Sequence, residues 1–96
     1  MTLIDRINLA IPEITRRLTP QAKTIFDHLV SAGSISSVEA HAVHRCRSVS
    51  RRITEIGDAL FEAKLRLPDP FPFSIRKVMR RDATGQRYTR YFLDRV

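Results

Sequence analysis

Two arginine-rich stretches, both from Arg45 onward, carry the residues best suited to bind another molecule. The first holds Arg45, Arg47, Arg51 and Arg52, and the second holds Arg80, Arg81, Gln86 and Arg87. An arginine guanidinium donates paired hydrogen bonds to phosphate oxygens and to the major-groove edge of guanine. These residue types therefore predict binding to a phosphate polyanion.

The distribution of charge along the chain supports this prediction. The formal net charge is +7 over 96 residues. Up to His44 the basic and acidic side chains balance, so the whole excess lies from Arg45 onward. Basicity confined to one half of a chain is typical of nucleic-acid binding, although ribosome-associated, toxin-like and inhibitor proteins share it.

The first arginine stretch follows the pattern of two short helices joined by a tight turn. Ser36 can cap the first helix with its hydroxyl, with Glu39 completing a capping box, and Ser48 can cap the second helix. Residues 45–47 leave room only for a turn. The second helix carries one apolar stripe, formed by Val49, Ile53, Ile56 and Leu60.

Polar residues of the second helix point away from this stripe, because successive side chains turn by about 100°. Those residues are Ser50, Arg51, Thr54, Glu55 and Asp58. We expect Arg51 to read base edges, with Ser50, Thr54 and Glu55 as its neighbours. The turn and the helix N-terminus should contact phosphate, through Arg45, Arg47 and Ser48. Arg52 lies toward the flank of the stripe, where an internal pair and a phosphate contact are both open.

Other segments are predicted to build the core that positions these residues. A helix should begin with Thr19 as N-cap and Pro20, and end at Gly33. Its apolar face is Ala22, Ile25, Phe26, Leu29 and Val30. Ile35 is expected in a short extended link. In the helix that follows Ser36, the core-facing residues should be Val38, Ala42 and Val43.

Residues 1–17 are predicted to form a helical arm in front of a domain that spans residues 18–96. Apolar residues recur at helical spacing, namely Ile4, Ile7, Ile11, Ile14 and Leu18. Pro12 should divide the arm into two helical pieces, since a proline inside a helix costs about 3 kcal/mol. The arm is either a dimerisation element or an extra helix packed on the core.

After Leu60 the sequence predicts a change from helix to extended chain and then a β-hairpin. Apolar residues alternate at 61, 63, 65 and 67, and three prolines punctuate residues 68–72. At least one of Phe71 and Phe73 should cover the core. Strands are expected at 74–79 and 87–93, with Gly85 in the connecting loop and with Tyr91 and Leu93 facing inward. The basic loop either follows a DNA backbone or is a solvated turn.

Three helices followed by a basic hairpin correspond to an α+β, mostly helical winged helix-turn-helix fold with an extra N-terminal helical arm. Three parts of the chain also match motifs of a known family: LTPQAKTIFDHL, GSISSVEA with SVSRRITEI, and GQRYTRYFL. The matching residues are Leu18, Thr19, Pro20, Ile35, Ser36, Glu39, Ala40, Ser50, Arg52, Ile53, Tyr91 and Leu93. Over residues 18–93 the chain resembles the small helix-turn-helix domains of bacteriophage and prophage proteins. The resemblance implies a transcriptional regulator or an accessory replication or excision factor in the bacterial cytoplasm.

Other classes of function have little support in the sequence. His41, His44 and Cys46 have ligand chemistry, but a fourth ligand is not evident apart from His28, so no metal or other cofactor is predicted. No paired carboxylates, nucleophile motif or phosphate-binding glycine loop occurs, so we expect no enzyme. The single cysteine excludes an internal disulfide, and no run is long enough to cross a membrane.

Two functions remain open at this point. The first is a small protein that binds duplex DNA through a recognition helix at about residues 48–60 and a basic wing at about residues 80–87. A homodimer formed through the N-terminal arm would read a palindrome with half-sites about 34 Å apart. The second is a protein-binding module, in which the same fold binds or inhibits a host protein without reading DNA sequence.

Overall fold

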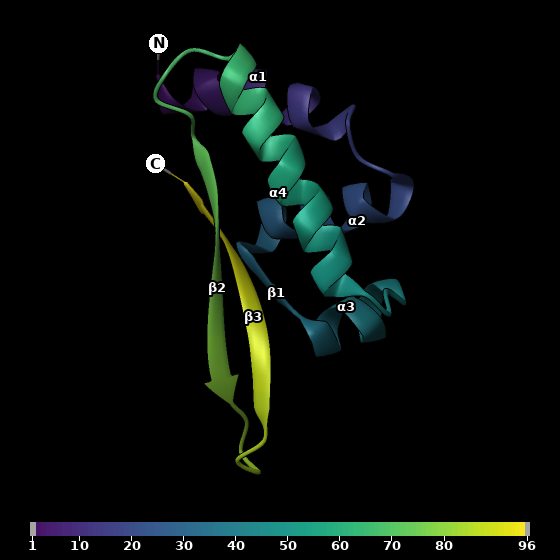
Figure 1. Ribbon diagram of the computed structural model, residues 1–96. Coiled ribbons are helices and arrows are strands. Elements are labelled where there is room, and N and C mark those ends of the chain that lie inside the picture. The colour runs from purple at the N-terminus through teal and green to yellow at the C-terminus, as the bar shows by residue number, and fades with distance from the viewer. Residues whose placement is uncertain (1, 96) are drawn as a thin grey trace.

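The computed structural model describes residues 2–95, which form four helices and a three-stranded antiparallel sheet (Figure 1). The elements are α1 (Leu3–Thr15), α2 (Pro20–Ala32), β1 (Ser34–Ser36), α3 (Ser37–His44), α4 (Val49–Arg66), β2 (Phe73–Arg81) and β3 (Arg87–Arg95). β3 lies between β1 and β2 in the sheet. The helices gather beside one end of the β2–β3 hairpin, and the rest of the hairpin extends beyond them (Figure 1). The predicted α+β, mostly helical fold with a C-terminal hairpin is confirmed.

One hydrophobic core joins the helices to the sheet. Its largest fully buried side chains are Phe26, Ile14, Ile25, Leu29, Ile35 and Ile56. Phe26 meets Phe73 of β2 edge to face, with ring centroids 6.2 Å apart, and Phe71 meets Phe73 at 6.4 Å. Burying each such side chain contributes about 1.5–3 kcal/mol. Phe71 within the proline-rich loop and Phe73 directly after it therefore both cover the core, which confirms that prediction.

α1 is one continuous helix, so the predicted division at Pro12 is wrong. Thr2 and Asp5 form a reciprocal capping box at its start, with hydrogen bonds of 3.1 and 3.2 Å. Ala10 and Ile14 are fully buried in the common core, where α1 packs against α4. The cap and the buried face together offset the hydrogen bond that Pro12 cannot donate.

α2 and β1 follow the sequence pattern closely. Thr19 is the N-cap residue of α2, Pro20 opens the helix, and Gly33 ends it with a left-handed φ of 86°. This conformation is accessible to glycine without steric cost. Ile35 is fully buried in β1 and lies opposite Tyr91 of β3, so the short extended link becomes the third strand of the sheet.

α3 turns a different face to the core from the one predicted. Val38 and Val43 are 69% and 63% exposed, and Ala42 is exposed as well. The buried residue of α3 is Ala40, and its N-cap residue Ser36, the last residue of β1, is buried as well. Ser36 and Ala40 are one helical turn apart, and small residues at this spacing allow the neighbouring elements to approach closely. The three predicted core positions are therefore corrected.

α4 continues through Arg66, so the predicted extended segment after Leu60 is wrong. Ala59, Leu60 and Ala63 are buried at helical spacing, whereas Phe61 and Leu65 are 62% and 68% exposed. The alternation at 61, 63, 65 and 67 arises because an inward alanine lies between two outward apolar residues. It does not reflect strand geometry.

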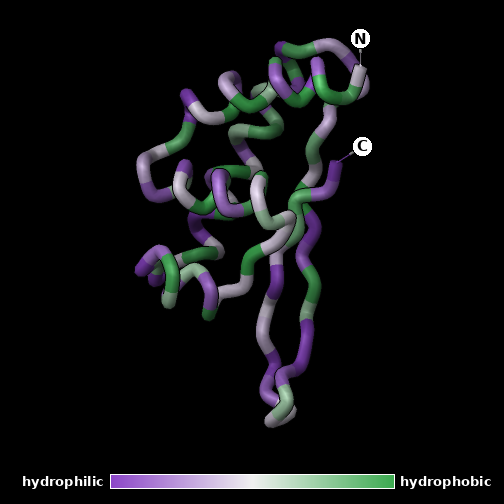
Figure 2. Tube along the Cα trace, turned by 180° about the vertical axis from the view of Figure 1, so that it is seen from behind, coloured by the Kyte–Doolittle hydropathy of each residue, from purple (hydrophilic) through white to green (hydrophobic). Residues whose placement is uncertain are grey.

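The hairpin has longer strands and a shorter turn than the sequence predicts. The strands cover residues 73–81 and 87–95, so Arg80 and Arg81 belong to β2 and the turn is confined to residues 82–86. Gly85 has the expected positive φ, at 84°. Tyr91 and Leu93 are buried as predicted. Figure 2 shows apolar residues throughout the helical body and mostly hydrophilic ones in the far half of the hairpin.

Candidate nucleic-acid interface

The turn between α3 and α4 holds Arg45 in an unusual backbone conformation. Arg45 has a left-handed φ of 54°, and its N–H donates to the carbonyl of His41 at 3.0 Å. The next N–H, that of Cys46, donates to Ala40 at 3.0 Å, and the Cys46 side chain is buried. A residue with a Cβ loses about 1–2 kcal/mol in this conformation. The turn thus directs the Arg45 side chain to solvent at an energetic cost that glycine would avoid.

Ser48 stands at the N-cap position of α4, but its hydroxyl does not cap the helix. This corrects the prediction. Its backbone has φ −125° and ψ 63°, outside the extended conformation that brings an N-cap hydroxyl to the helical N–H groups. Ser48 is exposed, so its hydroxyl and the positive end of the α4 dipole are both available to an anion.

The outward face of α4 begins with small polar residues around one arginine. Ser50, Arg51 and Thr54 are exposed, and Thr54 Oγ1 donates to the carbonyl of Ser50 at 3.1 Å. A shallow open depression of about 620 Å³ covers this face, lined by Ser48, Ser50, Arg51, Arg52, Thr54, Glu55 and Asp58. Of the residues predicted to reach bases, Arg51 is exposed and has a long, positively charged side chain.

Arg52 and Glu55 connect α4 to the start of α2. Glu55 Oε2 accepts hydrogen bonds from the Thr19 N–H and hydroxyl, both at 2.8 Å, and Oε1 accepts from Arg52 Nη1 at 3.2 Å. The backbone N–H of Thr19 is the main cause that lowers the pKa of Glu55, and the charge of Arg52 acts in the same direction. Of the two roles left open for Arg52, the internal pair is therefore formed in this structure.

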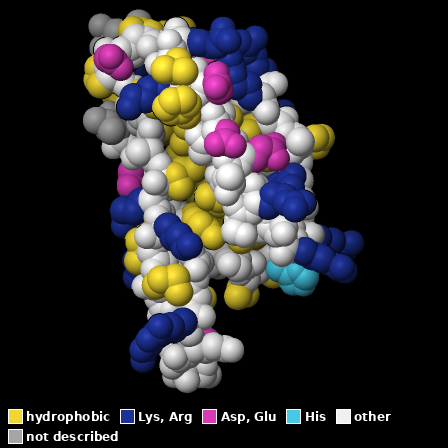
Figure 3. Space-filling model, viewed as in Figure 1, with side chains coloured by type: hydrophobic (Ala, Val, Ile, Leu, Met, Phe, Trp, Pro, Cys, Tyr) yellow, Lys and Arg dark blue, Asp and Glu magenta, His cyan; other side chains and the backbone are white. Residues whose placement is uncertain are grey.

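The outward face of α4 changes character along its length. At about 100° per residue, Asp58, Phe61 and Leu65 lie on the same side of the helix as Ser50 and Thr54. Acidic side chains gather over the middle of α4 in Figure 3, and this helix contributes Glu55, Asp58 and Glu62. A polyanion is repelled by these carboxylates, so only the first turns of α4 suit it.

The tip of the hairpin is organised by Asp82. Its Oδ1 accepts from the Thr84 N–H (2.9 Å), the Thr84 hydroxyl (2.6 Å) and the Gln86 N–H (3.0 Å). The Thr84 hydroxyl is the main cause that lowers the pKa of Asp82, followed by the Gln86 N–H. Gly85 donates to the Asp82 carbonyl at 3.0 Å. Because the carboxylate is used within the turn, the tip is ordered without contact to the helices.

Arginines of the hairpin lie next to this ordered tip. Arg81 and Arg87 are directly opposite each other across the two strands, and both are exposed. Like charges in this position repel and destabilise a strand pair, so a bound anion would relieve the repulsion. The Arg80 guanidinium lies over the ring of Phe92, 5.5 Å from its centroid.

The predicted contact residues lie toward one end of the molecule. In Figure 1 the N-terminal end of α4 and the hairpin tip both lie at the end opposite the chain termini. Between the start of α3 and the hairpin lies an open groove of about 690 Å³, whose walls include Ser37, Val38, Gln86, Arg87 and Thr89. The turn, the first turns of α4 and the tip of the wing thus lie toward the same end of the molecule. Arg52 and Glu55 line the same depression as Arg51, but they differ from it because they hydrogen-bond to each other and Glu55 also accepts from Thr19.

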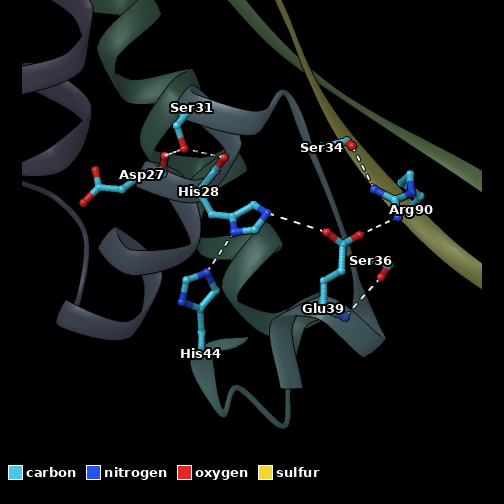
Figure 4. Close-up of polar contacts among 8 residues, drawn as sticks. All are labelled: Asp27, His28, Ser31, Ser34, Ser36, Glu39, His44 and Arg90. Atoms are coloured by element: carbon cyan, nitrogen blue, oxygen red, sulfur yellow. Dashed lines mark hydrogen bonds and ion pairs between the residues drawn. The ribbon is translucent and has the colours of Figure 1, made fainter. Parts of the chain in front are cut away.

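A polar network missed by the sequence reasoning fixes α3 between α2 and β3 (Figure 4). His28 Nδ1 lies 2.9 Å from His44 Nε2, and His28 Nε2 lies 3.8 Å from the Glu39 carboxylate. Glu39 also pairs with Arg90, whose Nη1 donates to Ser34 Oγ at 2.9 Å. Burial opposes ionisation of Glu39, but the charge and hydrogen bonds of Arg90 outweigh it and lower its pKa.

Glu39 serves the start of α3 as well. Its N–H donates to Ser36 Oγ at 3.1 Å, as predicted for an N-cap serine. The two histidines, Glu39 and Arg90 come from α2, α3 and β3 and have no common sequence signal, so their contacts could be found only in the tertiary structure.

The ligand-type residues noted in the sequence separate in the fold. Cys46 is buried in the core, while His44 faces His28 on α2. Residues 2–95 contain no group of three side chains placed to hold a metal ion. Within the same range, no helix is both long and apolar enough to span a bilayer.

Basic residues within the strands were also missed as possible contacts. Arg76 and Lys77 of β2 are exposed, and Arg76 lies 4.5 Å over the Phe92 ring while it pairs with Asp94 at 2.9 Å. The charge excess after Arg45 includes both residues, and strand periodicity could have identified Arg76 and Arg80 as sharing a face.

Comparison with known proteins gives one match. Residues 20–63, which cover α2 to most of α4, match the model of a family described as a winged helix-turn-helix domain. No curated protein and no solved structure matches the chain. The family match covers the helix pair, and the structure adds the β2–β3 hairpin after it in the position of a wing. Residues 20–63 are therefore similar to a winged helix-turn-helix domain, and the α+β fold with its C-terminal hairpin is consistent with that match.

Proposed function

We propose that this protein binds duplex DNA with the first turns of α4 in the major groove and the β2–β3 hairpin along the neighbouring backbone. One observation carries the proposal: the exposed cations of the turn, of α4 and of the hairpin lie toward one end of a winged helix-turn-helix domain. An α-helix fits the major groove, and basic wings contact phosphates or the minor groove.

Roles within this interface follow from exposure and partners. Arg51 reads a base edge, with Ser50 and Thr54 beside it. Arg45, Arg47 and Ser48 contact phosphate at the helix N-terminus. In the hairpin the phosphate contacts come from Arg80, Arg81, Gln86 and Arg87. Arg52 and Glu55 act indirectly, because their hydrogen bonds to each other and to Thr19 set how α4 is held against α2.

The biological role that we infer is regulation of transcription, or an accessory step of replication or excision, for a phage or prophage. It rests on the resemblance of residues 18–93 to proteins of that origin and on the absence of any recognisable catalytic motif in the sequence. Such a role places the protein in the bacterial cytoplasm, at the nucleoid.

Fluorescence anisotropy with a random-sequence duplex at low salt tests the proposal. The wild-type chain should bind, and Arg51→Ala together with Arg80→Ala and Arg81→Ala should weaken binding strongly with the fold retained by circular dichroism. Lys23→Ala, an exposed cation on α2 in the neutral half of the chain, is the matched control and should change little. Absence of wild-type binding to any duplex would refute the proposal. Selection from a random duplex pool would then give the recognised sequence.

A homodimer is a further part of the proposal. Ile4 and Leu9 of α1 are 69% and 47% exposed, which leaves apolar surface for a second copy. Deleting the helix would also remove Ala10 and Ile14 from the core, so a surface substitution is the sharper test. Ile4→Glu should turn a dimer into a monomer by light scattering, with Glu13→Gln on the same helix as a comparison. A wild-type monomer at all concentrations would contradict it.

A further inference from the structure

β2 forms one edge of the sheet along its whole length. The strand order is β1-β3-β2, and within residues 2–95 the backbone of β2 pairs with no element except β3. In Figure 1 β2 runs along the outer side of the hairpin, with β3 and the helices to its other side. An edge strand of nine residues presents unpaired N–H and C=O groups, to which another extended segment can bind.

The hydrogen-bond pattern identifies the free backbone groups. The Asp82 N–H donates to the Gln86 carbonyl at 3.0 Å, and hydrogen-bonded pairs alternate with non-bonded pairs along an antiparallel ladder. From the other end, the Leu93 N–H donates to Gly33 at 2.9 Å, away from β2. Both observations imply that Arg76, Val78 and Arg80 of β2 bond to β3, and that the residues between them do not. The free N–H and C=O groups on the outer edge therefore belong to Ile75, Lys77, Met79 and Arg81.

Side chains along this edge favour one kind of partner. Within residues 75–81 of β2, four side chains are cations, namely Arg76, Lys77, Arg80 and Arg81. Met79 lies between them and is 58% exposed. Two copies joined edge to edge would bring the four cations of each chain together, and like charges across strands destabilise pairing. A strand that carries carboxylates would instead neutralise them.

We propose that residues 75–81 bind an extended acidic segment of a protein partner by antiparallel strand addition. Opposite positions 81 to 75 in turn, the partner carries the pattern acidic, acidic, apolar, apolar, acidic, acidic, apolar. Backbone hydrogen bonds hold the added strand, and the charges select it. The proposal does not depend on duplex binding. Because Arg80 and Arg81 would serve both partners, an acidic segment competes with DNA for the hairpin.

NMR with the full chain and a synthetic peptide tests the proposal directly. The probe is acetyl-Glu-Glu-Val-Val-Glu-Glu-Val-amide. Its binding should slow amide hydrogen exchange at Lys77, Met79 and Arg81, whose N–H groups are free. The amides of Arg76, Val78 and Arg80, already bonded to β3, should change little. Shifts at the arginine side chains without this alternating protection would show charge attraction alone and would overturn strand addition.

A proline substitution separates the backbone contribution from charge. Met79→Pro removes a free edge N–H but no ladder hydrogen bond, and it leaves every cation in place. Peptide affinity should fall at least about tenfold, because several backbone hydrogen bonds are lost together. Met79→Thr keeps the N–H and should bind like the wild type. Equal binding by both variants would contradict the proposal.

Two further measurements complete the test. If Met79→Pro lost its fold, a peptide N-methylated on the amides that face β2 would make the same comparison with the wild-type chain, and it should bind at least about tenfold more weakly. Equal binding of the methylated peptide would refute strand addition. Sedimentation of the wild type and Met79→Pro tests whether a second copy of this chain binds the edge of β2 instead. A dimer present only in the wild type would assign the edge to a second copy and overturn the acidic partner.

Discussion

α4 and the β2–β3 hairpin both present arginines, but they hold them in different ways. α4 lies directly on the core through Ile53 and Ile56, and of the two arginines near its start, Arg51 and Arg52, the second is tied to Glu55. The far half of the hairpin has no core beneath it and is ordered by its own turn and by cross-strand pairs. The helix therefore presents few side chains in fixed directions, whereas the hairpin presents several cations close together.

Acidic residues sharpen this contrast. α4 carries Glu55, Asp58 and Glu62 on or beside its outward side, which limits where a polyanion can lie. In the hairpin both acids already have partners, because Asp82 is used within the turn and Asp94 pairs with Arg76. We expect the helix to determine selectivity and the hairpin to determine the salt-dependent part of affinity.

Phe73→Ala should have the largest effect, because Phe73 joins the hairpin to the core through its contacts with Phe26 and Phe71. Removing a buried phenyl ring should lower the free energy of unfolding by about 3–5 kcal/mol, as measured by denaturant titration. Phe61→Ala is the matched control, since Phe61 is 62% exposed, and it should cost less than about 0.5 kcal/mol. Similar losses in the two variants would show that the hairpin is not anchored in this way.

Salt titration separates the two surfaces functionally. Joint replacement of Arg80, Arg81 and Arg87 by alanine should reduce the slope of log affinity against log salt by about 2.7, since each phosphate contact contributes about 0.9. Arg51→Ala should change the slope by at most about 0.9 and should instead relax discrimination at one base pair by about 1–3 kcal/mol. Equal slope changes would remove the distinction between the helix and the wing.

Glu55→Gln tests whether the internal pair on α4 is structural. The lowered pKa of Glu55 in the folded chain means that its contribution is present above the ordinary carboxyl pKa. The contribution is lost as the pH falls through the lowered value. At neutral pH the variant should be less stable by about 1 kcal/mol, and the difference should vanish in acid. Thermal unfolding across pH 2–7 measures it, and a difference independent of pH would contradict the role.

Arg45→Gly should have the smallest effect on stability, which it should raise slightly, while it weakens duplex binding. Glycine accepts the left-handed conformation at this position, so the free energy of unfolding should rise by about 0.5–1 kcal/mol. Loss of the charge should at the same time weaken duplex binding. Gly33→Ala, at the other left-handed helix end, should destabilise. A variant that is more stable and binds DNA equally well would remove Arg45 from the interface.

Local signals in the sequence were sufficient for much of the architecture. The start of α2 at Thr19-Pro20, its end at Gly33, the stripe on α4 and the positive φ of Gly85 each depend on residues within one or two turns. The predicted secondary structure was wrong where contacts with residues distant in sequence determine the local conformation. Pro12 lies within a helix because α1 is buried against α4, and the segment after Leu60 stays helical because Ala63 is in the core.

Local patterns predict the helix pair, the hairpin and the placement of the charge excess after Arg45, because caps, periodicity and composition are local properties. Which of those charges are free depends on the three-dimensional packing of the chain. Arg52 finds Glu55 and Thr19, and Glu39 finds Arg90, across elements that are distant in sequence. The free edge of β2 is likewise a matter of strand order, which no local pattern encodes. A side chain's partners depend on packing in three dimensions, so its availability to a ligand does too.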